Sequence, residues 1–443
     1  MTNQKPYVRG ALRPRRPRRA EGGRRAEGSD AIDLEIESIA AGGDGVGRVG
    51  RLVAFVPRTA PGDAVSVRLY ERAGGRFARG ELLAVRRAGP NRVDPPCPHY
   101  DGDRCGGCQL QHLSYEAQLV AKGRIARDAI TRIARRPVED VQVEASPRHW
   151  RYRSKLTLEI RRQGSGSWIA GLHRFDEPDD VFSLDDCPIT DARVVACWRD
   201  ILRAASDLPP ADRLRGSVRV TVDGFVFVLD GGTTWERAAA FRAAVPSLTE
   251  VWWRPDGGSR RLIERGQHVP GPAGASFSQV NDDVAALLRT HVVERAMSYS
   301  PESAVDAYAG SGATATALAA LGVRVTAIEA DRRAAAMSAR SLPTGSRSIS
   351  ARVEDVLQSV LPADVLIVNP PRSGISGQVA SVIAKVEPPP RVLLYVSCDP
   401  ATLARDLSRL ARYDIASLRA FDMFPQTAHV ETVCELVPGA AIS

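Results

Sequence analysis

The chain has 443 residues and a formal net charge of +8, with 44% hydrophobic and 25% charged side chains. This composition is ordinary for a globular protein, and the length favours two or three domains. No apolar run approaches the roughly 18 residues that span a bilayer, and the polar, Arg-rich N-terminus is unlike a secretory signal. We therefore expect a cytoplasmic protein without structural disulfides.

Most of the positive charge lies in residues 1–28, where nine Lys or Arg face two Glu. The remainder of the chain is nearly neutral. Because this tail has no apolar periodicity, we expect it to be disordered and able to hold nucleic-acid phosphates. A solubilising extension without a specific partner explains the same composition.

Short alternating strands separated by Gly and Pro turns occupy residues 29–88. Their spacing is typical of a small β-barrel of the oligonucleotide-binding type. Residues 89–272 have a mixed pattern, with a helix predicted near 115–135 and two hairpins after it. The second hairpin has Asp223-Gly224 at its turn, which is a strong hairpin signal. This middle region is predicted to be an α+β domain.

Three cysteines of the middle region, Cys97, Cys105 and Cys108, lie within twelve residues, and Cys187 in DDCPIT is a candidate fourth. Thiolates that converge in a reducing compartment usually hold zinc or an iron–sulfur cluster. Free, partly buried cysteines are the alternative. The spacing alone does not choose between zinc and iron.

The stretch WRYRSK, residues 150–155, combines aromatic and basic side chains. Such a stretch is suited to stack on and clamp single-stranded RNA. A half-exposed strand with a solvated basic face explains it equally well.

Strand–helix repeats begin near residue 273, with apolar strands that indicate a parallel sheet covered on both faces. DAYAGSGATATALA follows a predicted strand and opens a helix, and Gly310 and Gly312 let its backbone approach a ligand closely. Glu329, which ends the next strand, is suited to bind ribose hydroxyls. This pattern fits a nicotinamide dinucleotide as well as other nucleotide-like cofactors.

Cys398 lies just past the end of another predicted parallel strand, where open α/β sheets hold their active sites. A lone cysteine at such a position is also compatible with a small buried hydrophobe. The last predicted strand carries Glu431 within HVETVCELV.

Four segments, PCPHYDGDRCGGCQLQ, IVNPPRSG, SCDPATLARD and HVET, resemble the RNA 5-methyluridine methyltransferases. The resemblance covers roughly residues 30–443. It implies an N-terminal TRAM RNA-binding barrel, a central domain and a C-terminal Rossmann-like class I methyltransferase domain. It also implies a [4Fe–4S] cluster, held by Cys97, Cys105, Cys108 and Cys187, although the first gap of this motif is longer here than in the best-known members.

The same resemblance implies S-adenosylmethionine as cofactor. Besides the turn at Gly310 and Gly312, it places the binding residues at Gln279, Tyr308, Glu329 and Asn369. Three departures bear on affinity more than on the identity of the cofactor. Asn369 replaces the usual Asp, Ala313 lies where some members have a polar contact, and Arg352 lies where Asn or Asp is common.

By the matching motifs, Cys398 is the nucleophile and Glu431 the general base. C5 of uracil is too poor a nucleophile to attack a methyl sulfonium unaided, whereas a thiolate added at C6 places electron density on C5. A base must then remove the C5 proton so that the thiolate can leave. Because a free thiol has a pKa of about 8.5, Cys398 needs activation.

We therefore predict a monomeric, three-domain RNA uridine-5-methyltransferase, with domain boundaries near residues 28, 88 and 272. The barrel and the cysteines favour ribosomal over transfer RNA, with a target uridine that is single-stranded or flipped out of its stack. An amino-group methyltransferase, suggested by NPP, remains an alternative. An RNA-binding protein that has lost catalysis, suggested by Asn369, is another.

Overall fold

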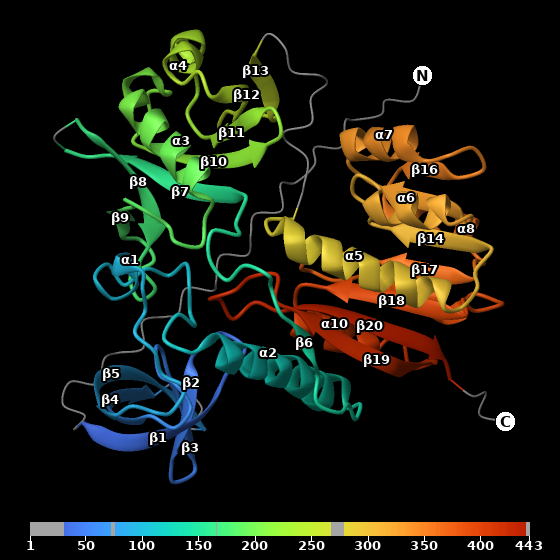
Figure 1. Cartoon of the computed structure of the whole chain (residues 1–443), viewed down its shortest axis with the longest axis horizontal. Coiled ribbons are helices and arrows are strands. Elements are labelled where there is room, and N and C mark those ends of the chain that lie inside the picture. The colour runs from blue at the N-terminus through green and yellow to red at the C-terminus, as the bar shows by residue number, and fades with distance from the viewer. Residues whose placement is uncertain (1–30, 72–75, 165, 267–278, 440–443) are drawn as a thin grey trace, which may run out of the picture. The chain divides into compact units, whose positions relative to one another are not determined.

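The computed structural model describes residues 31–71, 76–164, 166–266 and 279–439. The chain divides into two compact units, Met1–Arg92 and Val93–Ser443 (Figure 1). None of the helices in the described ranges is long and apolar enough to cross a membrane. The basic tail and the boundary predicted at residue 272 lie outside these ranges, and the domain boundaries stay predictions.

The described part of the first unit is a closed five-stranded β-barrel with the strand order β1-β2-β3-β5-β4. Parallel pairing of β3 with β5 and antiparallel pairing of β1 with β4 close it. Alternate residues, among them Leu34, Val56 and Val67, fill a small apolar core. The predicted barrel is therefore confirmed. Its strands are β1 (Ile32–Ile39), β2 (Gly45–Val49), β3 (Leu52–Val56), β4 (Ala64–Glu71) and β5 (Phe77–Arg87).

The second unit contains a mixed seven-stranded sheet with the order β13-β12-β11-β10-β7-β8-β9, called here the central sheet. Both predicted hairpins are present, because β7 pairs with β8 and β10 pairs with β11. One face packs against α3 and α4 around Ile160, Trp198 and Phe241. The elements are β7 (Lys155–Arg162), β8 (Trp168–His173), β9 (Val181–Ser183), α3 (Ala192–Arg203), η2 (Ala205–Asp207), β10 (Arg213–Thr221), β11 (Gly224–Asp230), α4 (Ala238–Ala244), β12 (Leu248–Arg254) and β13 (Arg261–Arg265).

The predicted parallel sheet is also present, within an eight-stranded sheet of order β16-β15-β14-β17-β18-β20-β19-β6, called here the C-terminal sheet. The strands from β16 to β18 are mutually parallel. Helices α5 and α6 cover one face and α8, α9 and α10 the other, with an apolar core on each side. The elements are α5 (Asp282–Met297), β14 (Ser303–Ala307), α6 (Ala313–Ala320), β15 (Arg324–Glu329), α7 (Arg332–Ser341), β16 (Arg347–Ser350), α8 (Val353–Val360), β17 (Val365–Val368), α9 (Gly377–Lys385), β18 (Val392–Ser397), α10 (Pro400–Leu407), β19 (Tyr413–Phe421) and β20 (Glu431–Pro438).

Segment 115–144 precedes the central sheet in sequence but packs on the C-terminal sheet. It contains α2 (Tyr115–Ala129), the π-helical turn η1 (Ile130–Ala134) and the edge strand β6 (Val143–Glu144), which pairs with β19. The Arg136 guanidinium donates to three carbonyl oxygens at and beyond the end of α10, at 2.6–3.0 Å. The cysteine segment, with the short helix α1 (Pro98–Asp101), leads directly into α2 (Figure 1).

Candidate functional site

The turn between β14 and α6 has three residues with positive φ: Tyr308 at 65°, Gly310 at 57° and Gly312 at 81°. A Cβ at Gly312 would lie 2.2 Å from the Ser338 hydroxyl oxygen on α7, so close packing as well as conformation requires glycine there. At Gly310 the same atom would meet nothing within 4 Å. Gly310 therefore faces open space, and the strained Tyr308 backbone is of the kind found at binding sites.

Glu329 lies at the end of β15 and is held against this turn. Its carboxylate accepts hydrogen bonds from the backbone N–H of Gly310 at 2.9 Å and of Asp331 at 2.7 Å. Beneath the turn, burial raises the pKa of Asp306 to about 7, and one oxygen of that carboxyl has no hydrogen-bond partner among the described residues. The turn thus combines free space with oriented carboxyl groups.

The other predicted cofactor residues lie in separate parts of the second unit. Asn369 follows β17 and is exposed, and its N–H donates to the carbonyl of Ala307 at 3.2 Å, which ties it to the end of β14. Gln279 is half-buried and lies two residues before Asn281, which caps α5. Burial raises the pKa of Tyr308 above its usual range. Asn369 and Tyr308 both lie at the carboxyl end of the parallel strands, directly after β17 and β14.

Cys398 and Glu431 come together at this same end of the sheet. Strand β20 runs antiparallel to β18 with Ser397 opposite Thr432, and the Thr432 hydroxyl donates to the Ser397 carbonyl at 3.1 Å. Cys398 directly follows Ser397 and Glu431 directly precedes Thr432, and the Glu431 carboxylate is close enough to raise the pKa of the Cys398 thiol. The two residues, 33 positions apart in sequence, are therefore spatial neighbours.

Charges around this pair act in opposite directions. Burial, then Glu431 and Asp399, raise the pKa of the Cys398 thiol, whereas Arg372 lowers it. Burial raises the pKa of the Glu431 carboxyl to about 7, against the same Arg372. Asp399 is occupied as the cap of α10, where it accepts hydrogen bonds from two backbone N–H groups at 3.0 Å. Sequence reasoning missed Arg372, although it lies in the motif NPPRSG.

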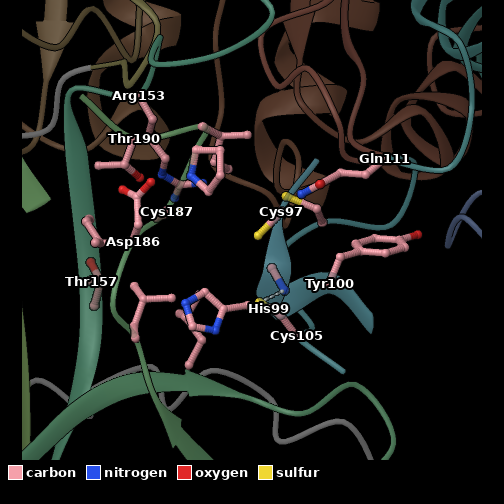
Figure 2. Close-up of a pocket in the computed structure, with 17 residues that line it drawn as sticks. Cys97, His99, Tyr100, Cys105, Gln111, Arg153, Thr157, Asp186, Cys187 and Thr190 are labelled. Carbon is pink, nitrogen blue, oxygen red and sulfur yellow. Dashed lines mark hydrogen bonds between the residues drawn. The ribbon is translucent and has the colours of Figure 1, made fainter. Parts of the chain in front are cut away.

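The four predicted thiols line one cavity of about 230 Å³. Figure 2 shows Cys97 and Cys105 on one side of it and Cys187 on the other, beside Asp186. Backbone N–H groups point at the sulfur atoms of Cys97 and Cys187, and the N–H of Gly107 donates to Cys105 at 3.4 Å. Burial raises the pKa of Cys108 well above its usual range, and the other three thiols add to this.

Gln111 also points into this cavity, where its side-chain amide forms hydrogen bonds with the sulfur atoms of Cys97 and Cys108. Nowhere in the described ranges, however, do three or more His, Cys, Asp or Glu side chains form a group tight enough to hold a metal ion. The thiols surround a space rather than a single point.

The predicted RNA clamp at residues 150–155 is only partly available. Arg151 pairs with Asp186 at 2.6 Å, and Tyr152 is 2% exposed with its hydroxyl donating to the Pro425 carbonyl at 3.0 Å. Tyr152 is therefore not available to stack on RNA, and the charge of Arg151 is already paired although its side chain is 41% exposed. Arg153 and Lys155 remain as the basic side chains of this stretch that could contact RNA.

Lys155 belongs to a crowded basic group on the face of the central sheet that α3 and α4 leave uncovered. Its cross-strand neighbour is Arg219 on β10. Burial lowers the pKa of Lys155, and so do Arg219, Arg260, Arg153 and Arg215. Like charges opposite each other in a sheet are destabilising, so this basic face, defined by these five residues, is suited to an anionic ligand.

Comparison with known proteins identifies relatives along nearly the whole chain. The family described as tRNA (uracil-5-)-methyltransferase matches residues 333–437. An uncharacterised RNA methyltransferase of Thermosynechococcus vestitus is 32% identical over 444 residues, covering 91% of this chain and 97% of that protein. One of Gloeobacter violaceus is 31% identical over 452 residues, covering 91% and 96%.

Among solved structures, the tRNA (uracil-54, C5)-methyltransferase of Pyrococcus abyssi, in complex with S-adenosyl-L-homocysteine, covers 92% of this chain and 100% of its own. Its TM-score of 0.66 at 22% identity shows a shared fold. Together with the full-length relatives and the family match, this establishes that the chain is an enzyme of the RNA uracil-5-methyltransferase family.

Proposed function

We propose that this enzyme transfers a methyl group from S-adenosylmethionine to C5 of a uridine in RNA through a covalent bond to Cys398. The observation that supports the proposal is the closeness of Cys398 to Glu431 at the carboxyl end of the parallel strands, where the glycine turn also lies. Methylation of uracil C5 needs a thiolate and a base beside one ring, and this end of the sheet offers both.

The chain's residues act in a fixed order. The Cys398 thiolate adds to C6 of the uracil ring, and the ring becomes an enolate with electron density on C5. Bound S-adenosylmethionine supplies the electrophilic methyl group that C5 takes up. The Glu431 carboxylate then removes the C5 proton, the bond between Cys398 and C6 breaks, and the ring double bond and the thiolate are restored.

The electrostatics around the pair suit these roles. A base with a pKa of about 7 is ionised in a substantial fraction at neutral pH and still binds a proton strongly. Arg372 supplies the positive charge that favours the Cys398 thiolate. Because Arg372 is exposed, it is free to meet the RNA or the ring.

The residues present fit the cofactor. The open space at Gly310 admits a ligand close to the backbone, and Glu329, oriented by two N–H donors, has lone pairs left to accept from ribose hydroxyls. We assign Gln279, Tyr308 and Asn369 to the same ligand. Because the Asn369 amide carries no charge, it pairs less strongly with the ammonium of the donor than the usual Asp would.

We further propose that Cys97, Cys105, Cys108 and Cys187 hold a [4Fe–4S] cluster. Zinc needs its four sulfur ligands about 2.3 Å from one point, whereas these thiols surround a cavity of about 230 Å³. The N–H donors aimed at the sulfur atoms stabilise thiolates. Methyl transfer moves no net electrons, so the cluster's place is structural, fixing the segments that carry the thiols.

The RNA substrate is proposed to contact the barrel, as a TRAM module, and the basic face of the central sheet. A ribosomal target is favoured by the barrel and the thiols together. Transfer RNA is the alternative, and it is the substrate named for the matching family and for the Pyrococcus abyssi enzyme.

The mechanism is tested with RNA that contains 5-fluorouridine, since fluorine cannot leave as a proton. Incubation with S-adenosylmethionine should trap a protein–RNA adduct through Cys398, seen as a denaturation-resistant band and mapped by mass spectrometry. No adduct with an RNA that the enzyme methylates would remove the covalent mechanism. Mass-spectrometric mapping of ribosomal and transfer RNA from a deletion strain identifies the target.

A further inference from the structure

The loop that leads into Glu431, residues 422–430 between β19 and β20, is unusually buried for a connection. Asp422, Gln426, Thr427 and Val430 are each at most 3% exposed. Surface loops normally leave their polar groups to water. The polar groups of this loop therefore have to be satisfied by protein.

Gln118, on α2, provides several of these hydrogen bonds although it lies 308 residues away from Gln426 in sequence. Its side-chain amide donates to Gln426 Oε1 at 2.9 Å and to the Leu113 carbonyl at 3.0 Å. In return, its Oε1 accepts from the backbone N–H of Gln426 at 2.9 Å. Both residues are buried, with 1% and 3% exposed, so these are bonds that water does not replace.

Gln426 itself has φ of 70°, a left-handed conformation that non-glycine residues adopt only where their surroundings enforce it. Its carbonyl accepts from the N–H groups of Gln109 and Leu110, at 3.1 and 3.0 Å. Gln109 is the residue directly after Cys108. Hydrogen bonds with α2 and with the cysteine segment thus hold the loop at its strained residue Gln426.

We propose that Gln118 is a positioning residue that, through Gln426, sets the place of the Glu431 carboxylate. Four residues separate Gln426 from Glu431, and β20 begins at Glu431 itself. A general base has to reach within roughly 2.6–3.2 Å of the proton it removes. This inference rests on the proposed function, because it assigns Gln118 to one step of that reaction.

The step at stake is the last one. Cys398 lies between β18 and α10, outside the loop, so addition to C6 and methylation proceed without Gln118. Loss of the C5 proton requires Glu431 in place. A protein with a displaced base therefore stops with methylated uracil still bonded to Cys398, whereas a general loss of folding gives no bond at all.

The experiment compares Gln118→Met with wild type, using total RNA from a deletion strain and S-adenosylmethionine labelled in its methyl group. Gln118→Met keeps the length of the side chain and deletes its hydrogen bonds. Glu431→Gln is the reference for a missing base, and Gln358→Ala, on the exposed side of α8, is the matched glutamine control. The readouts are labelled protein–RNA adduct and released methylated RNA.

Gln118→Met should accumulate the labelled adduct with ordinary uridine, as Glu431→Gln does, and release methylated RNA roughly 10²-fold more slowly. Gln426→Ala, which keeps the carbonyl bonds to Gln109 and Leu110, should show the same pattern more weakly. Release at the wild-type rate without adduct overturns the proposal, as does failure of both variants to form adduct. If wild type itself forms no adduct with 5-fluorouridine RNA, the proposed function fails instead.

Discussion

The two thiol regions of the second unit share burial, which raises the thiol pKa in both, but differ in the charges around the sulfur atoms. Cys108 is buried among three other thiols, and every neighbouring thiol raises its pKa further. Cys398 is half-buried, and burial and Glu431 raise its pKa, but Arg372 acts against them and lowers it. A thiol surrounded by thiols becomes anionic only when a metal or cluster binds it, whereas a thiol near a cation is prepared for nucleophilic attack.

The sharpest way to break this comparison is to remove the sulfur from each region in turn. Cys398→Ser should lower methylation by about 10⁴-fold or more, because no other group supplies the covalent bond. Cys197→Ala, which removes a buried thiol on the core-facing side of α3, should leave the rate within a few-fold. Methyl incorporation into RNA measures both. Equal losses in the two variants would contradict a special role for Cys398.

Removing a thiol from the cavity should instead affect metal content and stability. Cys108→Ser is expected to lose bound iron and several kcal/mol of folding free energy, since metal binding and folding are coupled. Iron and zinc analysis of the purified protein, visible absorption and thermal unfolding check this. Full-length wild type with zinc and no iron would show that the four-iron assignment is wrong.

The two regions are joined by the buried ion pair of Lys122, on α2, and Asp422, at the start of the loop, both 0% exposed. Lys122 also donates to the Phe424 carbonyl at 2.9 Å. Lys122→Met should cost about 3–5 kcal/mol of stability, because it leaves Asp422 buried and unpaired. Lys122→Met combined with Asp422→Leu should recover most of it. Denaturant unfolding measures both, and a single variant that loses nothing would contradict the coupling.

The titration of Glu431 distinguishes its role from that of the metal-site thiols. With a pKa of about 7, proton removal should slow tenfold per pH unit below 7 and level off above it. Folding stability has the opposite trend. The unfolded Glu431 ionises near 4.5, so its buried neutral form is favourable below that pH, and this advantage is lost as pH rises through 7.

Glu431→Gln removes the cost of a buried charge. The variant should therefore be more stable than wild type at pH 8, by about 3 kcal/mol, while losing turnover. Thermal unfolding at pH 5 and pH 8 checks the sign, since the difference between the two proteins should be smaller at pH 5.

Local pattern predicted the parts of these regions but not how they meet. The hairpins, the parallel strands and the four thiols were predicted because turn chemistry, apolar periodicity and motif resemblance are local signals. The neighbourhood of Cys398 and Glu431 depends on β20 inserting antiparallel between β18 and β19, which no local signal specifies. The bonds of Gln118 to Gln426 join residues 308 positions apart and lie beyond such reasoning.

The misreading of residues 150–155 has the same origin. Composition shows that Arg151 and Tyr152 are basic and aromatic, but not that an acid 35 residues away neutralises one and burial removes the other. The two-residue strand β6 is likewise too short to leave a sequence pattern. Tertiary contacts, rather than propensity, decide all of these.

The smallest expected effect concerns the basic face, which differs from both thiol regions in having no part in the chemistry. Arg215→Ala should weaken RNA binding several-fold and reduce the slope of log affinity against log salt by about one, as the loss of one phosphate contact does. Arg340→Ala, at the exposed end of α7, is the matched control and should leave the slope unchanged. Binding is measured with catalytically inactive Cys398→Ser over a series of salt concentrations. Because both arginines carry one charge, equal slopes for the two variants would mean that only the net charge of the protein matters, and the crowding of Arg219 and Lys155 around Arg215 would then have no part in holding RNA.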